Sequence, residues 1–249
     1  TLDENQSRLQ YGFTTGVSPI YAALIITEVI AEAKDHRETL YLTTMDTSKA
    51  FDVVNHEAML NSLFKQGVDN QFFHLYHSMY QNITSVVKWK GNMSKPFEEK
   101  QGIRQGGSSS ADKYKAGKNR LLHQLDCYTS NRIGHLPVGA IMVADDLVIT
   151  AKEPYRQQIS LNIAQCDAAK DRYKFNTDKT KTITLNSNDD HVFHLNGKPL
   201  GSSTAEPHLG IVRNSEGDNT ATITERIKSA RRATFSLLGA GYYGVNGVG

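Results

Sequence analysis

Two adjacent aspartates, Asp145 and Asp146, interrupt an otherwise apolar stretch that reads AIMVADDLVIT. Burying carboxylates beside Val143 and Leu147 is costly unless a cation or a hydrogen-bond network compensates for the lost hydration. In a β-hairpin, the apolar strands can lie in a core while an acidic turn stays at the edge of the sheet. The stretch therefore predicts a hairpin over residues 138–151 with the aspartates at its tip. Such a tip suits divalent-ion binding, although an ordinary polar turn is the alternative.

A third acidic residue, Asp46, follows a segment in which Leu40, Leu42 and Thr44 alternate with their neighbours. This alternation predicts a half-buried strand with Asp46 at its C-terminal end. Three carboxylates would meet if this end lay beside the hairpin. Mg²⁺ prefers hard oxygen ligands and often shares them with phosphates, and two such ions can stabilise both reacting oxygens of a phosphoryl transfer. The acids predict metal-dependent nucleotidyl transfer, provided that the two segments meet.

Several segments resemble, in order, the motifs of reverse transcriptases. DTSKAFDVV resembles motif A, GIRQGGSSSADKY motif B, VADD motif C, FNTDKTKTITL motif D and HLGIV motif E. LQYGFTTGVSPIYAALIITEVI is similar to the block that precedes motif A in non-LTR (LINE-type) retrotransposon polymerases, and ARRATFSLLGAGYYGVNGVG is similar to the start of their thumb. Because these segments cover nearly the whole chain, it resembles the reverse transcriptase domain of a non-LTR retrotransposon.

The resemblance implies an α+β fold, namely the palm of a right-hand polymerase with partial fingers and the start of a thumb. It implies partial fingers over residues 1–38, a palm with interleaved fingers segments over 39–213, and a truncated thumb over 214–249. The residue pattern also favours α+β, because helical segments interleave with antiparallel hairpins. Expected helices cover 18–36, 55–64, 69–80, 111–127, 154–173 and 222–238. Expected strands cover 84–90 and 95–100, joined around Gly91–Asn92, and 181–186, 192–195 and 207–213.

The resemblance further implies an RNA-directed DNA polymerase, a nucleotidyltransferase that adds dNTPs to a DNA primer on an RNA template. Two Mg²⁺ ions are the implied cofactors, with Mn²⁺ as an alternative. The chain lacks an initial methionine and is expected to be part of a longer polyprotein. It is expected to act inside the cell, in the nucleus or cytoplasm, within a ribonucleoprotein and without a membrane partner, because its longest apolar run is too short to span a bilayer.

Roles in catalysis follow from the resemblance for five residues. Asp46, Asp145 and Asp146 match the metal-binding acids, and the backbone carbonyl of Thr47 matches a further ligand. Lys179 matches the motif D lysine, which could protonate the leaving pyrophosphate as a general acid. Solvated loop residues are the alternative for lysine, as acidic turns and caps are for the aspartates.

Roles in substrate and nucleic-acid binding also come from the resemblance. The position of Phe51 implies exclusion of a 2′-hydroxyl by steric clash, with a core phenylalanine as the alternative. Further matches imply a template or nucleotide contact at Gln105 and Gly106, primer placement at Leu209 and Gly210, and nucleic-acid contact at Arg231 and Arg232. The chain departs from its relatives at Ser109 and Ala111 of motif B, where the usual residues are leucine and proline, and at Val143 of motif C, where an aromatic is common.

Charge and cysteine content narrow the function only weakly. The chain has 249 residues and a net charge of +2, which does not by itself indicate a nucleic-acid partner. Basic residues cluster at two places and are read either as solvated helix faces or as phosphate contacts: Lys113, Lys115, Lys118 and Arg120, then Arg226, Lys228, Arg231 and Arg232. The two cysteines, Cys127 and Cys166, are expected to be reduced and structural.

Two alternative functions stay open at this stage. A decayed, non-catalytic nucleic-acid-binding relic would explain the altered motif B and the lack of an earlier fingers block. A metal-dependent phosphohydrolase could use the same acids, but it would leave motif B without an explanation.

Overall fold

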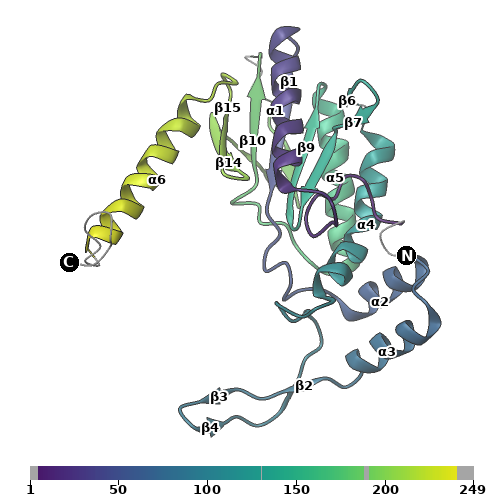
Figure 1. Cartoon of the computed structure of the whole chain (residues 1–249). Coiled ribbons are helices and arrows are strands. Elements are labelled where there is room, and N and C mark those ends of the chain that lie inside the picture. The colour runs from purple at the N-terminus through teal and green to yellow at the C-terminus, as the bar shows by residue number, and fades with distance from the viewer. Residues whose placement is uncertain (1–4, 130, 188–190, 240–249) are drawn as a thin grey trace.

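The computed structural model describes residues 5–129, 131–187 and 191–239. At its centre lies a sheet with the strand order β13-β10-β1-β9-β8 (Figure 1). Its strands are β1 (Leu40–Met45), β8 (Ala140–Val143), β9 (Asp146–Ala151), β10 (Lys181–Leu185) and β13 (Gly201–Ser202). Strand β1 runs antiparallel to both neighbours, β9 and β10. The segments that carry the predicted acids are therefore adjacent strands.

Both faces of the central sheet are buried. On one face, Tyr41 of β1 and Ile149 of β9 pack with the apolar residues of two helices, and on the other face Leu42 and Val148 pack against a third helix. Successive strand residues point to opposite faces, so each strand contributes to two cores. The prediction of a half-buried strand before Asp46 is wrong, because residues 40–43 and 45 are all buried. The polar residues Thr43 and Thr44 suggest an exposed face, but Thr43 is buried and hydrogen-bonded to Thr182.

Helices cover the two faces of the sheet. Helix α1 (Pro19–Asp35) packs on β8 and β10, whereas α4 (Ser110–Tyr128) and α5 (Pro154–Asp171) pack together on the other face. The Ser18 side chain accepts a hydrogen bond from the N–H of Ile20, and Pro19 occupies the first turn, where its missing N–H costs nothing. These layers confirm the expected α+β class, and each of the three helices lies within two residues of its expected bounds.

Two further helices adjoin α4. They are α2 (His56–Lys65) and α3 (Asn70–Tyr80), and the side chains of Asn55 and Asp69 cap their first turns. Met59 and Leu63 of α2 pack with Tyr114 of α4 in a third apolar cluster. Asn and Asp are favoured at the N-cap position because their side chains accept from free N–H groups of the first turn.

A long hairpin extends from the end of α3 away from the body of the molecule (Figure 1). Within it, β2 (Thr84–Ser85) pairs with β5 (Phe97–Glu98), and β3 (Lys88–Trp89) pairs with β4 (Asn92–Met93). The predicted hairpin is confirmed, but its turn lies at Lys90–Gly91 rather than Gly91–Asn92, because Trp89 pairs with Asn92.

Short antiparallel pairs outside the central sheet and a last helix complete the fold. The pairs are β6 (Arg132–Ile133) with β7 (Leu136–Pro137), β11 (His194–Leu195) with β12 (Lys198–Pro199), and β14 (Ala205–His208) with β15 (Ile211–Asn214). The prediction of one strand over 207–213 is wrong, because Leu209 and Gly210 adopt positive φ angles and turn the chain.

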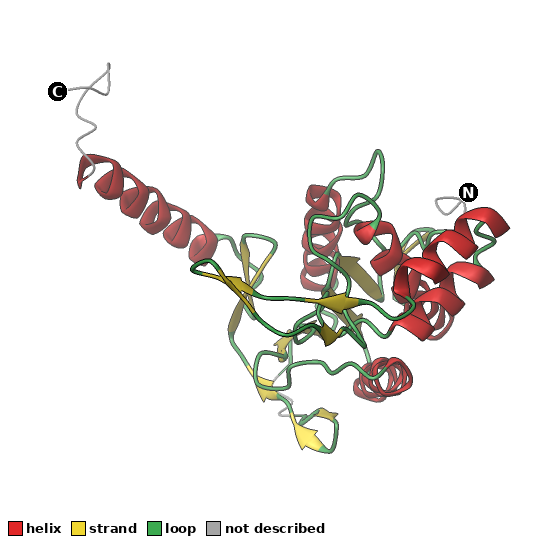
Figure 2. Ribbon diagram, turned by 90° about the horizontal axis from the view of Figure 1, so that it is seen from below, coloured by secondary structure: helices red, strands yellow, loops and turns green. Residues whose placement is uncertain are grey.

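Helix α6 (Thr220–Gly239) projects from the body in both ribbon views (Figure 2). The final residues of the segment compared with a thumb, 240–249, lie outside the described residues. Across the described ranges, no helix has both the length and the apolar content needed to cross a bilayer. Cys127 and Cys166 are free thiols and exposed.

Candidate active site

Asp46 is positioned by the end of the buried strand β1. Its carbonyl accepts a hydrogen bond from the N–H of Asn176 at 2.9 Å, and the N–H of Ser48 donates to the Lys174 carbonyl at 3.1 Å. These two bonds flank a bridge between Thr47 and Phe175, and they do not use the Thr47 carbonyl. The carbonyl proposed as a metal ligand is therefore not occupied by this bridge.

Asp145 and Asp146 lie at the tip of the β8–β9 hairpin, as predicted. Val143 pairs with Asp146, so Ala144 and Asp145 form the turn. Ala144 has a φ of 58°, a left-handed conformation that is costly for a residue with a Cβ. The surrounding structure must hold this turn in place.

The N-terminal segment holds the aspartate turn through Gln10. The Gln10 Oε1 accepts hydrogen bonds from the N–H groups of Gly12 at 2.8 Å and Ala144 at 3.0 Å, and Nε2 donates to the Ala144 carbonyl at 3.2 Å. Gly12 lies so close that a Cβ there would be 2.1 Å from the Ala144 nitrogen. Sequence reasoning missed both residues, since neither carries a signal of its contact with a turn more than a hundred positions away.

The β1–β9 register brings the three aspartates together. Met45 pairs with Leu147, so Asp46 and Asp146 follow at the same end of adjacent antiparallel strands. Asp46, Asp146 and Lys179 line a recess of about 340 Å³. Asp46 and Lys179 also line a second recess, of about 430 Å³, together with Thr47 and Asp145. The two segments thus meet, as the metal-site prediction requires.

The aspartates influence one another electrostatically. Burial raises the pKa of the Asp146 carboxyl, the negative charges of Asp145 and Asp46 raise it further, and the Lys179 ammonium opposes them. Lys179 Nζ lies 3.3 Å from Asp46 Oδ2. The Asn176 Oδ1 accepts from the N–H of Asp178 at 3.1 Å and of Lys179 at 3.3 Å, and so orders the loop that carries the lysine. The Lys179 ammonium is therefore held at Asp46, the aspartate that lines both recesses.

The acids do not form a closed metal cage. Among the described residues, no three histidine, cysteine, aspartate or glutamate side chains are arranged to hold a metal ion. The donor set still fits Mg²⁺ in kind, because it consists of carboxylate oxygens and a carbonyl. The Lys179 ammonium at Asp46 is a stand-in for positive charge, so a bound cation would have to share or replace that ion pair.

Phe51 is half-buried and belongs to the apolar cluster around α2. Its ring stacks on Tyr114, with centroids 4.9 Å apart, and meets Phe13 edge-on at 6.2 Å. Burial raises the pKa of the Tyr114 hydroxyl, and the charge of Asp145 acts in the same direction. The Phe51 ring therefore packs on a tyrosine whose pKa is influenced by the charge of Asp145.

The motif B residues Gln105 and Gly106 lie in an exposed loop before α4. Neither lines the two acidic recesses. The Ser110 hydroxyl donates to the Arg104 carbonyl at 2.7 Å and ties the loop to the start of the helix. Gly106 has a φ of 81° and open space at its Cβ position, so its backbone is accessible.

Leu209 lines the smaller recess beside the acids, in the β14–β15 turn. The carbonyl of Gly210 in that turn accepts from Arg226 at 3.0 Å. Arg231 and Arg232 are exposed on the projecting helix α6, and Arg232 lies 3.8 Å from Glu225. The structure thus brings Leu209 to the acids and places these two arginines on a separate element.

The basic cluster after motif B fits neither of its sequence interpretations. Lys113, Lys115 and Lys118 are buried, with 3–6% of each residue exposed, so they are neither a solvated face nor surface phosphate contacts. Lys118 Nζ lies 3.2 Å from the centroid of the Tyr173 ring. Burial lowers the pKa of Lys118 to about 8, although Asp167, Asp171 and Asp145 oppose the shift. The lysines lie on a face of α4 that is covered by other parts of the chain, and the sequence alone does not show which parts these are.

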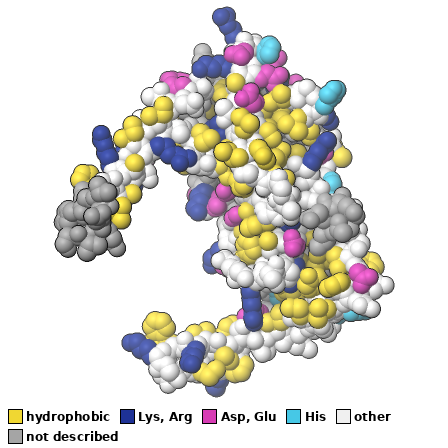
Figure 3. All heavy atoms as spheres, in the orientation of Figure 1, with side chains coloured by type: hydrophobic (Ala, Val, Ile, Leu, Met, Phe, Trp, Pro, Cys, Tyr) yellow, Lys and Arg dark blue, Asp and Glu magenta, His cyan; other side chains and the backbone are white. Residues whose placement is uncertain are grey.

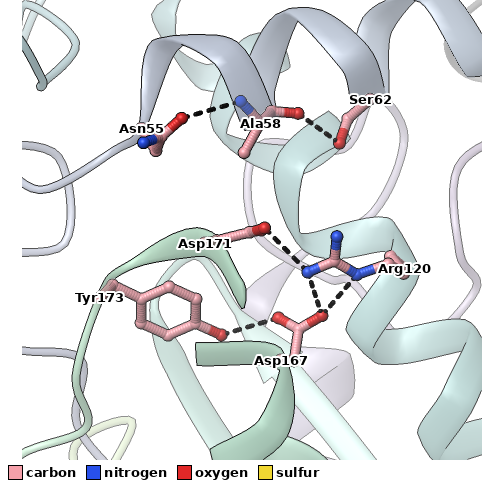
Figure 4. A network of polar contacts seen from close by, with 7 residues as sticks. All are labelled: Asn55, Ala58, Ser62, Arg120, Asp167, Asp171 and Tyr173. Carbon is pink, nitrogen blue, oxygen red and sulfur yellow. Dashed lines mark hydrogen bonds and ion pairs between the residues drawn. The ribbon is translucent and has the colours of Figure 1, made fainter. Parts of the chain in front are cut away.

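Arg120 forms the polar connection between α4 and α5 (Figure 4). Its guanidinium donates to Asp167 at 2.8 Å and to Asp171 at 2.9 Å, and the Tyr173 hydroxyl donates to the second oxygen of Asp167 at 3.0 Å. The Asp167 side chain is fully buried. Because a buried carboxylate is stable only when paired and hydrogen-bonded, this network fixes α5 against α4.

Comparison with known proteins places the chain among polymerases. A family model described as "Reverse transcriptase (RNA-dependent DNA polymerase)" matches residues 1–239. A Pol polyprotein of a type-1 R2 retrotransposable element from Nasonia vitripennis is 26% identical over 208 residues, which is 78% of this chain and 20% of that protein. A type-2 R2DM polyprotein from Drosophila melanogaster is 26% identical over 163 residues, or 66% of this chain and 15% of that protein. The chain therefore spans about a fifth or less of these relatives.

Solved telomerase structures share the fold. Telomerase from Candida tropicalis in complex with a fragment of telomeric RNA matches with a TM-score of 0.61 and 17% identity, over 86% of this chain and 34% of that chain. A truncated apo form matches with a TM-score of 0.58 and 19% identity, over 84% and 40%. These likenesses confirm the predicted right-hand polymerase fold.

Proposed function

Because the chain belongs to the reverse transcriptase (RNA-dependent DNA polymerase) family, we propose that it extends a DNA primer with dNTPs on an RNA template. The resemblance to non-LTR retrotransposon enzymes, predicted from the motifs, is confirmed by the family model and the R2 relatives. We propose that the chain is the polymerase part of a longer polyprotein that acts inside the cell, in the nucleus or cytoplasm, within a ribonucleoprotein. The division into partial fingers, palm and thumb start, at residues 38 and 213, belongs to the same proposal.

One observation carries the polymerase proposal. The end of β1 and the β8–β9 turn place Asp46, Asp145 and Asp146 around two recesses that share Asp46 and Lys179. When bound there, two Mg²⁺ ions, or Mn²⁺ in their place, would activate the primer 3′-hydroxyl and stabilise the departing pyrophosphate. Asp46 and Asp145 would hold the ions with the Thr47 carbonyl, and Asp146 would contribute more weakly.

The remaining residues act on substrate and nucleic acid in this proposal. Lys179 turns from Asp46 to the triphosphate and donates a proton to the leaving group. Phe51 packs under the sugar of the dNTP, and the stacking of the Phe51 ring on Tyr114 would hold the ring in place for this contact. The template and primer contacts are the residues expected from the motifs: Gln105, Gly106, Leu209, Gly210, Arg231 and Arg232.

Substitution of Asp145 tests the proposal. Asp145→Asn removes one carboxylate charge with little change of shape, and we expect primer extension on a poly(rA) template with Mg²⁺ to fall at least about 100-fold, as for loss of a group that stabilises transition-state charge. Asp35→Asn, an exposed residue at the end of α1, is the matched control and should retain activity. Undiminished Mg²⁺-dependent extension by Asp145→Asn would refute the assignment.

A second candidate is a nucleic-acid-binding protein without catalysis. It is favoured by the open arrangement of the acids in the described residues and by the Lys179–Asp46 ion pair. RNA binding without primer extension by the unaltered chain, measured in parallel under the same conditions, would support this candidate over the polymerase.

A further inference from the structure

The tip of the long hairpin combines an exposed aromatic ring with positive charge. Trp89 is the single tryptophan of the chain and is 71% exposed. The tip, residues 86–95, contains no acidic residue and three lysines: Lys88, Lys90 and Lys95. The exposed ring and the lysines at the end of the hairpin contribute nothing to a hydrophobic core. A binding partner would give them a role.

The backbone presents the indole in a defined position. Trp89 pairs with Asn92 across a turn in which Lys90 has a φ of 46° and Gly91 a φ of 83°. Two positive φ angles are typical of a type I′ turn, which favours Asn or Gly over lysine at its first central position. Behind it, the N–H of Val87 donates to Ser94 Oγ and the N–H of Ser94 donates to the Val87 carbonyl, both at 2.9 Å.

The hairpin borders the concave side of the molecule. Figure 3 shows a hollow between the hairpin and helix α6, with lysine and arginine side chains along its edges. A strand that lay along this side would pass the tip without contacting the buried core. Aromatic rings on which bases stack, together with cations that follow the phosphates, are how proteins bind single strands without reading sequence.

We propose that the β3–β4 hairpin is a stacking platform for single-stranded nucleic acid. One base lies on the Trp89 indole, and Lys88, Lys90 and Lys95 contact neighbouring phosphates. The proposal rests on the proposed function only in that a polymerase supplies the strand. It adds a contact outside the acidic recesses, because no residue of the tip lines them.

The single tryptophan allows the site to be tested directly. Oligo(rU) and oligo(dT) of equal length, added to the whole chain, should quench the fluorescence of Trp89, and the quenching should weaken as salt is raised. Preferential quenching by oligo(rU) would assign the platform to an RNA strand, and preferential quenching by oligo(dT) to a DNA strand. No quenching by either oligonucleotide, or a fluorescence change that depends on protein concentration alone, would overturn the proposal.

Substitutions identify the groups involved. In an anisotropy assay with a labelled oligonucleotide, Trp89→Ala should weaken binding about fivefold to hundredfold, the range for loss of one stacked base, and Trp89→Phe should restore part of it. Lys88→Gln with Lys90→Asn should lower the slope of log affinity against log salt by ~1.4, or ~0.7 for each phosphate contact. Asn keeps the left-handed turn while it removes the charge.

A second hairpin supplies the control. Lys198→Gln removes one exposed charge beside the turn of β11 and β12, where Asn196 and Gly197 also have positive φ angles. It should leave both affinity and salt slope unchanged. A fall of ~0.7 in the salt slope of Lys198→Gln, the same change per charge as at the tip, would mean that net charge alone governs binding and would overturn the platform.

The outcomes separate this proposal from the proposed function. Asp145→Asn should retain full quenching while it loses primer extension. For the unaltered chain, extension without quenching would reject the platform alone, and quenching without extension would reject the polymerase proposal alone. Circular dichroism and thermal unfolding of Trp89→Ala should match the parent chain, because so exposed a side chain adds little to stability.

Discussion

His208 is the most unusual ionisable residue beside the acidic recesses. It lies in β14, lines the recess that holds Asp46 and Asp146, and is 6% exposed. Among the described residues, neither ring nitrogen has a hydrogen-bond partner. Burial lowers the pKa of His208 to about 4, and the positive charge of Arg213 acts in the same direction. The folded chain therefore requires a neutral imidazole at this position.

This requirement makes stability depend on pH. Below the ordinary histidine pKa of about 6.5, the unfolded chain binds a proton that the folded chain does not accept until about pH 4. We therefore expect stability to fall with pH across this window, by about 2 kcal/mol between pH 7 and pH 5 from this group alone. Urea unfolding of the parent chain and His208→Gln at both pH values measures the difference.

The comparison of variants isolates this effect from the carboxylates, which titrate in both chains. His194→Gln, at an exposed position in β11, should follow the parent curve. If His208→Gln lost as much stability on acidification as the parent, the buried histidine would not be responsible.

At this scale the sequence predicted residues whose chemistry follows from their own position. Each of the three aspartates comes at the end or tip of an apolar strand, so its placement could be inferred from neighbouring residues. Gln10 and Lys118 could not, because a buried polar side chain is explained only by partners that the fold supplies. His208 could not be inferred either, because its burial depends on how the β14–β15 pair packs.

At the scale of elements, the N-terminal segment and the β8–β9 hairpin depend on each other. Leu9 and Tyr11 form backbone hydrogen bonds with Met142, both at 2.8 Å, and Gln10 holds the turn itself. Since Ala144 is in a left-handed conformation, the contact stabilises a geometry that the hairpin would not favour alone.

Gly12→Ala tests this dependence. The added Cβ would lie 2.1 Å from the nitrogen and 2.8 Å from the Cα of Ala144, and backbone atoms cannot move aside as a flexible side chain can. We expect a loss of roughly 1–3 kcal/mol in the free energy of unfolding, as for overpacking. Primer extension should fall even in the fraction that remains folded, because the turn carries Asp145.

The control is another glycine-to-alanine substitution, Gly117→Ala in α4. No atom lies within 4 Å of its added Cβ, and alanine should stabilise the helix by roughly 0.5–1 kcal/mol. Denaturant midpoints and extension assays of the two variants give the comparison. Equal midpoints for both variants would show that the N-terminal segment is not tightly packed on the turn.

Helices were the elements that the sequence predicted well, because caps and periodicity are local. The short strands are predicted poorly, and the sequence pattern predicts one strand where the structure has the pair β14 and β15. The turn between them uses Leu209 at a φ of 50°, a residue that does not favour this conformation, so no residue before Gly210 predicts a break in the strand.

The whole molecule is a sheet covered on both faces, from which a hairpin projects (Figure 1) and helix α6 projects in both ribbon views (Figure 2). The side chains described over residues 228–237 are all exposed. Hydrogen bonds fix the base of the helix: the Val212 N–H donates to Thr222 Oγ1 at 2.9 Å, the Thr222 hydroxyl donates to the Val212 carbonyl at 3.1 Å, and Arg226 donates to the Gly210 carbonyl.

A chain that ends at Ile227 keeps those contacts and omits the rest of the helix. We expect its unfolding temperature to change by less than a few degrees, as for surface changes. Its affinity for RNA should fall, and the slope of log affinity against log salt should lessen by about 2, if Lys228, Arg231 and Arg232 each contact a phosphate. Calorimetry and anisotropy measure the two effects.

A full-length variant with glutamine at these three positions separates lost charge from lost helix. It should reproduce the weaker RNA binding. A large fall in the unfolding temperature of the shortened chain would show instead that the body depends on this helix.

The order of the motifs predicted the family and the fold class, but not the shape of the molecule. Which face of α4 is buried depends on α5 and on the ring of Tyr173, and the sequence alone did not pair these segments. The register of β1 against β9, which brings the acids together, likewise required the structure.

The contact between Gln10 and Ala144, which are 134 positions apart, has a consequence for folding during synthesis. Gln10 is translated well before Ala144. Until Ala144 has been made, the Gln10 side chain lacks the backbone N–H and carbonyl that it binds in the folded chain. The acidic tip can therefore adopt the conformation described here only after Ala144 has been translated, and a nascent chain interrupted before that point would present Gln10 without the turn that it holds.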